Sequence, residues 1–308
     1  MDLNIKKLPV RTDYLQKKTI DPRLPQHRFR LGVIAPSYSG KTNMILSLIK
    51  EKRFYWDYFK VFIFSKSIYD DPIFDNINIA EKYTCDELST KKIQKILSHQ
   101  SYLKNKYEEE DKLEKLPNLL FIIDDCAGSS ELSSRTSIIN TLMFRGRHNN
   151  LSLIIVSQAY KMLSKNIRTN FSDLIFYGAE NQGELKAIAE ENSGGISNKK
   201  FEKLFNYATS KRFNFLYISR KHKGKQRFRK NFDTSIWIED DRVKEEPLIL
   251  EYPKIQKKTI IVRPSKINYK RIPPRKQKKP PTILQACFEN IVVESSTDES
   301  SSSDYDEY

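Results

Sequence analysis

The 308-residue sequence lacks the features that mark secreted, membrane or metal-binding proteins. Its three cysteines (Cys85, Cys126, Cys287) are odd in number and show no paired metal spacing, which indicates a reducing compartment rather than a disulfide framework. No apolar run approaches the roughly 18 residues of a membrane span, and the first residues lack the apolar stretch of a signal peptide. We therefore expect an intracellular protein with no membrane span.

Acidic residues are few relative to basic ones, 39 against 54, and the net charge is +15. Acids without any base gather after residue 293, so the remainder of the chain is more basic still. This excess indicates an anionic partner, most simply nucleic acid, with a merely solubilising basic surface as the alternative. Because no base-reading motif is present, we expect DNA binding to be independent of sequence.

Short apolar runs alternate with helical patterns through the first two thirds of the sequence. The expected strands are 31–35, 60–65, 119–125, 151–158, 173–177 and 213–219. The expected helices are 42–52, about 88–115, about 132–147, 181–192 and 198–208. Continuously apolar strands alternating with helices predict an α/β fold with a mostly parallel sheet covered on both faces.

Composition divides the chain into four expected parts. Residues 1–28 form a charged, proline-containing arm, and 29–235 form the α/β domain. Residues 236–290 form a basic extension, in which 254–279 hold eleven Lys or Arg and no acid. Residues 291–308 form an acidic, serine-rich tail that cannot bury enough apolar surface to order itself.

A small-residue loop joins the first expected strand to the first expected helix and ends in Gly-Lys-Thr. Such a loop cradles nucleotide phosphates with its backbone N–H groups and with the N-terminus of the helix. Lys41 would contact the terminal phosphates, and the Thr42 hydroxyl would ligate Mg²⁺. Ala35 stands where the pattern has its first glycine, which an alanine with negative φ can replace. The loop consists of Ala35, Pro36, Ser37, Tyr38, Ser39, Gly40, Lys41 and Thr42.

Two later strands end in polar residues that suit phosphoryl transfer. The run 119–125 ends in Asp124 and Asp125, of which the first would hold Mg²⁺ and the second would orient and polarise the attacking water. The run 151–158 ends in Gln158, whose amide can donate to a phosphate and accept from water. In enzymes with this sensor, its strand lies between the phosphate-loop strand and the acidic strand.

These segments together resemble the genome-packaging ATPases of nucleocytoplasmic large DNA viruses, the poxvirus-type branch of the FtsK–HerA superfamily of P-loop ATPases. The likeness covers about 30–220, and residues 57–67 and 167–170 add to it. The resemblance implies a RecA-like P-loop ATPase that uses ATP and Mg²⁺. It also implies a homo-oligomeric ring that drives double-stranded viral DNA into capsids and works with capsid or portal proteins. The place of action would be the host-cell cytoplasm, at the site of viral assembly, or the virion.

The resemblance also implies roles for single residues. Lys41, Asp125 and Gln158 would be catalytic, with an aspartate at 125 where many members of the superfamily have glutamate. Arg147 would be the arginine finger that reaches the nucleotide of a neighbouring subunit, with Arg145 and Arg168 as further candidates. The basic segment 220–230, which surrounds Gly224 at an expected hairpin turn, and the stretch 254–279 would face DNA.

Two other functions fit part of the pattern. A nucleotide or nucleoside kinase would share the phosphate loop, but such kinases generally lack the inserted Gln158 strand. A DNA-binding scaffold that keeps nucleotide only as a switch is left open by Ala35 and Asp125. No guanine-reading Asn-Lys-x-Asp is present, which favours ATP over GTP.

Overall fold

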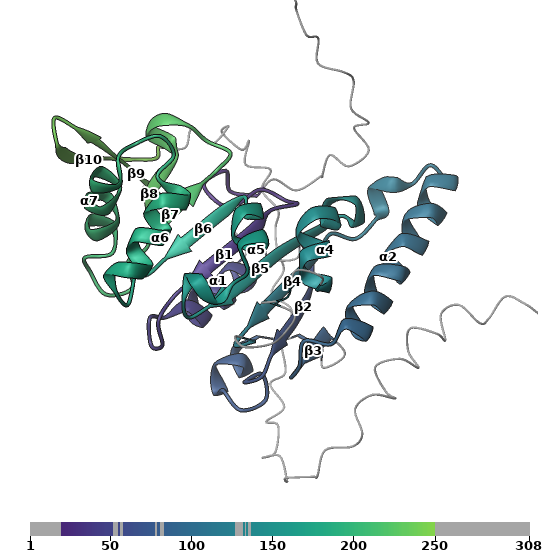
Figure 1. Cartoon of the computed structure of the whole chain (residues 1–308). Coiled ribbons are helices and arrows are strands. Elements are labelled where there is room, and N and C mark those ends of the chain that lie inside the picture. The colour runs from purple at the N-terminus through teal and green to yellow at the C-terminus, as the bar shows by residue number, and fades with distance from the viewer. Residues whose placement is uncertain are drawn as a thin grey trace, which may run out of the picture. The chain divides into compact units, whose positions relative to one another are not determined.

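The computed structural model describes residues 20–249 except 52–54, 56–57, 78, 81–82, 127–131, 133 and 135–136. Within this part of the chain, ten strands form one sheet in the order β10-β9-β8-β7-β6-β1-β5-β4-β2-β3 (Figure 1). The segment from residue 250 onward is a separate unit that includes the predicted basic stretch 254–279 and the acidic tail. Those two predicted segments and residues 1–19 lie outside the described residues.

The parallel half of the sheet contains six strands and confirms the predicted fold class. Its strands are β1 (Arg30–Ile34), β2 (Lys60–Ser65), β3 (Thr84–Cys85), β4 (Leu119–Asp124), β5 (Leu151–Ser157) and β6 (Asp173–Phe176). Strand β5 pairs with β1 on one side and with β4 on the other. Strand β5, which Gln158 follows, therefore lies between the phosphate-loop strand β1 and the acidic strand β4. This is the strand order expected if Gln158 acts as the phosphate sensor.

The sheet continues beyond β6 through antiparallel hairpins. These strands are β7 (Leu216–Ser219), β8 (Phe228–Lys230), β9 (Thr234–Glu239) and β10 (Arg242–Pro247). The hairpin expected around Gly224 is present, because β7 and β8 pair antiparallel on either side of it. The predicted domain boundary at 235 falls inside β9, and the sheet runs on to Pro247.

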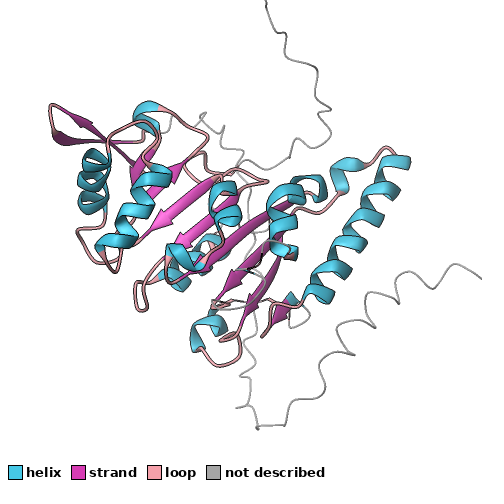
Figure 2. Ribbon diagram, viewed as in Figure 1, coloured by secondary structure: helices cyan, strands magenta, loops and turns pink. Residues whose placement is uncertain are grey.

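Helices cover both faces of the sheet (Figure 2). One core joins α2 (Thr90–Glu109), α4 (Ile138–Arg145), α5 (Lys165–Asn170), α6 (Gln182–Asn192) and α7 (Asn198–Ala208) to one face. The opposite face packs on α1 (Lys41–Lys50), on Tyr55 and on the segment around Ile20 and Leu24. Side chains of β4 alternate between the two cores, Phe121 and Ile123 facing one and Leu120 and Ile122 the other. This double burial explains why these strands are continuously apolar.

Local sequence signals account for most helix boundaries. Helices α2, α4, α5, α6 and α7 each begin after a Ser or Asn whose side chain accepts a backbone N–H of the first turn. The expected helix 88–115 is shorter than predicted, because α2 ends at Glu109 and a separate turn, η4 (Leu113–Lys115), follows. The expected strand 213–219 begins only at Leu216, and α5, β3, β9 and β10 were not predicted.

Candidate functional site

The phosphate loop occupies the turn between β1 and α1. Gly40 has φ of 85°, and an ideal Cβ placed on it would lie 3.0 Å from Cδ1 of the Phe213 ring. Tyr38 is also left-handed, with φ of 60°, and its side chain is 93% exposed. Glycine adopts this conformation without the steric cost of a Cβ, which favours Gly40 at this turn. The loop presents the N-terminus of α1 to solvent, where its free N–H groups favour an anion.

Asp124 lies at the end of β4, across from the first residues of α1. The Thr42 hydroxyl donates to Asp124 Oδ2 at 3.2 Å, and the N–H of Asp125 donates to Asp124 Oδ1 at 2.9 Å. Asp124 is 4% exposed, and this burial raises the pKa of its carboxyl, against the lowering effects of Lys41, of the Thr42 hydroxyl and of the Asp125 N–H. Asp125 follows with φ of 50° and an exposed side chain.

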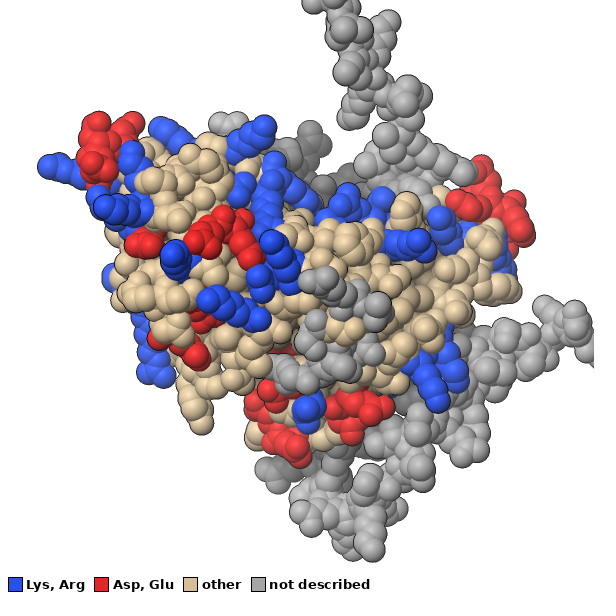
Figure 3. Space-filling model, viewed as in Figure 1, with Lys and Arg blue, Asp and Glu red and all other residues tan. Residues whose placement is uncertain are grey.

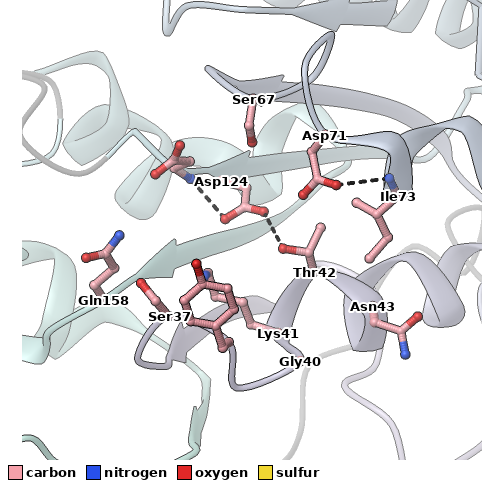
Figure 4. Close-up of a pocket in the computed structure, with 12 residues that line it drawn as sticks. Ser37, Gly40, Lys41, Thr42, Asn43, Ser67, Asp71, Ile73, Asp124 and Gln158 are labelled. Atoms are coloured by element: carbon pink, nitrogen blue, oxygen red, sulfur yellow. Dashed lines mark hydrogen bonds between the residues drawn. The ribbon is translucent and has the colours of Figure 1, made fainter.

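One cavity of about 550 Å³ brings these residues together. Figure 4 shows Lys41, Thr42 and Asp124 directed toward the same space, with Gln158 entering from the end of β5. The structure thus gathers the predicted phosphate-binding, acidic and sensor residues at one edge of the sheet. This is the edge at which parallel α/β sheets bind ligands. The cavity is lined by Ser37, Tyr38, Gly40, Lys41, Thr42, Asn43, Ser67, Asp71, Ile73, Asp124, Asp125 and Gln158.

The donor set fits a magnesium nucleotide. A hydroxyl and a carboxylate are hard oxygen ligands, and Mg²⁺ usually takes only one or two of them from protein while phosphates and water supply the others. Within the described ranges no group of three or more His, Cys, Asp or Glu side chains could hold a metal ion alone. In addition, Ser39 Oγ is buried with no hydrogen-bond partner in the described structure. A buried hydroxyl in this loop is suited to contact a phosphate oxygen.

A polar network follows directly after Gln158. Tyr160 N–H donates to Glu184 Oε1 at 2.5 Å, and its hydroxyl donates to Glu191 Oε2 at 2.8 Å. Asn192 Nδ2 donates to the same hydroxyl at 3.1 Å. The chain that carries the Gln158 amide is therefore attached to helix α6, which restricts the positions that Gln158 can adopt.

The three arginines proposed as fingers differ in environment. Arg145 and Arg147 are exposed and precede β5, whereas Gln158 follows it, so they lie at the opposite edge of the sheet from the cavity. Arg168 instead forms a bidentate ion pair with Glu191, at 2.7 and 3.1 Å, and its guanidinium lies 5.0 Å from the centroid of the Tyr160 ring. Arg168 therefore has a structural explanation within its own chain.

The basic hairpin 220–230 divides into buried and exposed residues. Arg220 donates to the carbonyls of residues 168, 169 and 171 and to Asn192 Oδ1, and Arg229 is 4% exposed. Lys221, Lys223 and Lys225 are exposed, and Lys225 Nζ lies 4.2 Å from the centroid of the Trp237 ring. Figure 3 shows Lys and Arg spread over much of the viewed face, with Asp and Glu in separate clusters. The three exposed lysines are the basic residues of this hairpin that are best placed to meet a phosphate backbone.

Four cavity residues were not predicted as site residues: Asn43, Ser67, Asp71 and Ile73. Ser67 lies just beyond the end of β2, which is a signal of the same kind as Asp124 and Gln158 at their strand ends. Asp71 caps the short helix η2 (Pro72–Asn76) by accepting from Ile73 N–H at 3.0 Å. Nothing in the local sequence of η2 indicates that it reaches the phosphate loop.

Solved structures with a similar chain trace have low sequence identity. The genome packaging NTPase B204 from Sulfolobus turreted icosahedral virus 2, in complex with AMP, is 16% identical, and the match covers 66% of this chain and 96% of that chain with a TM-score of 0.46. The pCW3 conjugation coupling protein TcpA with ATPγS is 13% identical, covering 63% and 58% with a TM-score of 0.42. At these values the likeness carries no argument about activity. Among curated proteins, none matches the sequence significantly.

A family match covers the whole site. The family described as Poxvirus A32 protein matches residues 17–233, which is more than half of the chain. This span includes the phosphate loop, the acids at the end of β4 and Gln158, and it confirms the resemblance to the poxvirus-type branch. No helix in the described part of the chain is long and apolar enough to cross a membrane. The chain belongs to the poxvirus A32 protein family.

Proposed function

We propose that this chain is an ATP-hydrolysing motor that moves double-stranded DNA during viral genome packaging. The observation that supports this function best is the single cavity that combines the Gly40–Thr42 corner, the two acids and Gln158. Membership of the poxvirus A32 protein family supports a DNA-packaging ATPase.

Hydrolysis would use the residues around the cavity in distinct ways. The loop N–H groups and Lys41 would bind the phosphates, and Thr42 and Asp124 would hold Mg²⁺, which would supply charge neutralisation at the phosphate oxygens. Asp125 would orient the attacking water and accept its proton, because its exposed side chain lines the same cavity as Asp124. Gln158 donates to the terminal phosphate and accepts from the water. Catalysis is then mostly positioning and charge neutralisation.

A complete site would need a second copy of the chain. Arg147 precedes β5 and Gln158 follows it, so the length of the strand separates this arginine from the cavity of its own chain. Its exposed side chain is free to enter the cavity of a neighbouring copy in a ring. An arginine supplied in this way is worth about 10³–10⁵ in rate where it has been measured in GTPases.

The DNA contacts would be electrostatic. Lys221, Lys223 and Lys225 project from the hairpin, and nothing in the described surface resembles a base-reading element. Binding would therefore be independent of sequence and would weaken with salt. A role in virion assembly within the host cell follows from this function, with capsid or portal proteins as partners and the cytoplasmic assembly site or the virion as location.

The two alternatives are distinguishable by activity. A nucleotide kinase would transfer phosphate to a small acceptor without DNA stimulation, and the inserted β5 strand argues against it. A nucleotide-switched scaffold would retain nucleotide tightly and turn over slowly whether or not DNA is present.

The decisive experiment measures ATP hydrolysis with and without duplex DNA for the wild type, Lys41→Ala, Arg147→Ala and the control Arg145→Ala. We expect DNA to stimulate the wild type, both Lys41→Ala and Arg147→Ala to be nearly inactive, and Arg145→Ala to remain active. Mixing the two inactive variants should restore part of the activity, because some interfaces then combine an intact Lys41 with an intact Arg147. A wild type that DNA does not stimulate would contradict the motor.

A further inference from the structure

One large aromatic side chain packs against the phosphate loop and remains exposed. Phe213 lies in the connection between α7 and β7, and its ring is the nearest group to the position that a Cβ on Gly40 would take. The residue is nevertheless 56% exposed. Because Leu216 pairs with Phe176 at the end of β6, this connection enters the sheet at the edge where the phosphate loop leaves β1. An exposed aromatic ring thus borders the loop that would hold the phosphates.

The backbone at Phe213 is strained. Its φ is 68°, in the left-handed region that bulky residues rarely occupy. The guanidinium of Arg212 lies 4.7 Å from the centroid of the ring, which adds positive charge beside the loop. Residues held in sparsely populated backbone regions cluster at ligand sites, which makes Phe213 a candidate for a functional contact. The core does not need this ring, since it lies outside both buried clusters.

The position of Phe213 suits the base end of a nucleotide rather than its phosphate end. Lys41, the two acids at the end of β4 and Gln158 line the cavity. Phe213 is not among its lining residues. The loop N–H groups at Gly40 would hold the inner phosphates, so the nucleoside must leave the loop over a neighbouring surface. Phe213 lies against Gly40 and provides an apolar surface there.

We propose that the Phe213 ring is the stacking surface for the base of the bound nucleoside triphosphate. This inference rests on the proposed function, since it requires a nucleotide at the phosphate loop. Every base has a flat π-face, so stacking on Phe213 contributes affinity with little preference for adenine over guanine. Discrimination between bases would then require other groups.

The test is calorimetric titration of the full chain with three probes in the presence of Mg²⁺: ATP, GTP and inorganic tripolyphosphate. Phe213→Gly removes the ring while easing the left-handed backbone, so this variant is expected to fold. It should bind ATP and GTP roughly 5- to 150-fold more weakly, the range that stacking of one base implies, and tripolyphosphate as the wild type does. Phe213→Trp should retain ATP affinity, and Tyr102→Ala, which removes a ring 57% exposed on α2, should change nothing.

The outcomes separate this inference from the function on which it rests. Wild-type affinity for ATP in Phe213→Gly would overturn the stacking role and leave the ATPase intact. An equal loss of ATP and tripolyphosphate affinity would also overturn it, because the ring would then merely support the loop. A wild-type chain that binds none of the three probes would overturn both the proposed function and the stacking surface.

Discussion

Replacing Gly40 with alanine tests the phosphate loop directly, because the structure specifies two separate costs. An alanine held at φ of 85° is destabilised by roughly 1–2 kcal/mol. Its Cβ would also lie 3.0 Å from the Phe213 ring, but that ring is 56% exposed and can move aside, so this contact adds little. We therefore expect Gly40→Ala to lower the free energy of unfolding by about 1–2 kcal/mol and the midpoint of thermal unfolding by roughly 2–8 °C.

Activity should fall much further than stability. If the loop relieves its strain by leaving the left-handed conformation, its N–H groups move away from the phosphates, and a displacement of about 1 Å costs roughly 100-fold in rate. The assays are urea denaturation of the nucleotide-free chain and steady-state ATP hydrolysis. The expected result is a folded protein with a small loss of stability and a large loss of turnover.

Two other glycines provide controls with opposite expectations. A Cβ on Gly178 would meet nothing within 4 Å, so Gly178→Ala should be neutral or slightly stabilising and fully active. A Cβ on Gly32 would lie 2.8 Å from both Leu174 and the Phe171 ring, which are buried and cannot move freely, so Gly32→Ala should destabilise by overpacking, about 1–3 kcal/mol or more. A Gly40→Ala chain with wild-type stability and wild-type hydrolysis would refute the reasoning.

Two further predictions concern charge. Burial lowers the pKa of His27 from its ordinary 6.5 to about 4, so the unfolded chain takes up a proton at this residue at a higher pH than the folded chain does. The contribution of His27 to the free energy of unfolding is therefore complete above pH 6.5. It should decline by up to about 3 kcal/mol as pH falls toward 4. Urea denaturation between pH 4 and 7 measures this decline, and His27→Gln should flatten it; an equal slope in both chains would exclude His27 as its source. Lys223→Ala should leave stability within about 0.5 kcal/mol and reduce the salt dependence of DNA binding by about one unit of slope. Arg220→Ala should instead lower stability, since its guanidinium donates to three carbonyls and to Asn192; equal unfolding midpoints for the two variants would contradict this division.

The edge of the sheet that lines the cavity was predictable because its signals are local. Each strand that leads into the cavity is apolar along its length and ends in a polar residue, as β4 does at Asp124 and β5 does before Gln158. Parallel strands bring such ends to one edge whatever the details of their connections. The Gly-Lys-Thr corner adds a backbone requirement that only a few residue types satisfy, and Gly40 meets it with a left-handed φ.

The antiparallel part of the sheet was less predictable. Strand β10 lies at the edge of the sheet, and most of its residues are exposed and charged. Its sequence therefore has no apolar pattern that would predict a strand. Its place in the sheet depends on pairing with β9, and β9 in turn pairs with β8. The boundary expected at residue 235 reflects a change in composition, whereas the sheet continues for as long as neighbouring strands offer hydrogen bonds.

The sequence by itself determined the α/β class, the phosphate loop, the acidic strand and the Gln158 strand, because each depends on residues that are adjacent along the chain. Only the tertiary structure decided which basic residues are available. Arg220 and Arg168 are occupied by carbonyls and Glu191, whereas Lys223 and Arg147 are exposed. Only the tertiary structure placed Phe213 on Gly40. The physical reason is the same in each case: what a side chain is free to bind depends on neighbours that lie far away in sequence, and no local pattern of residues specifies them.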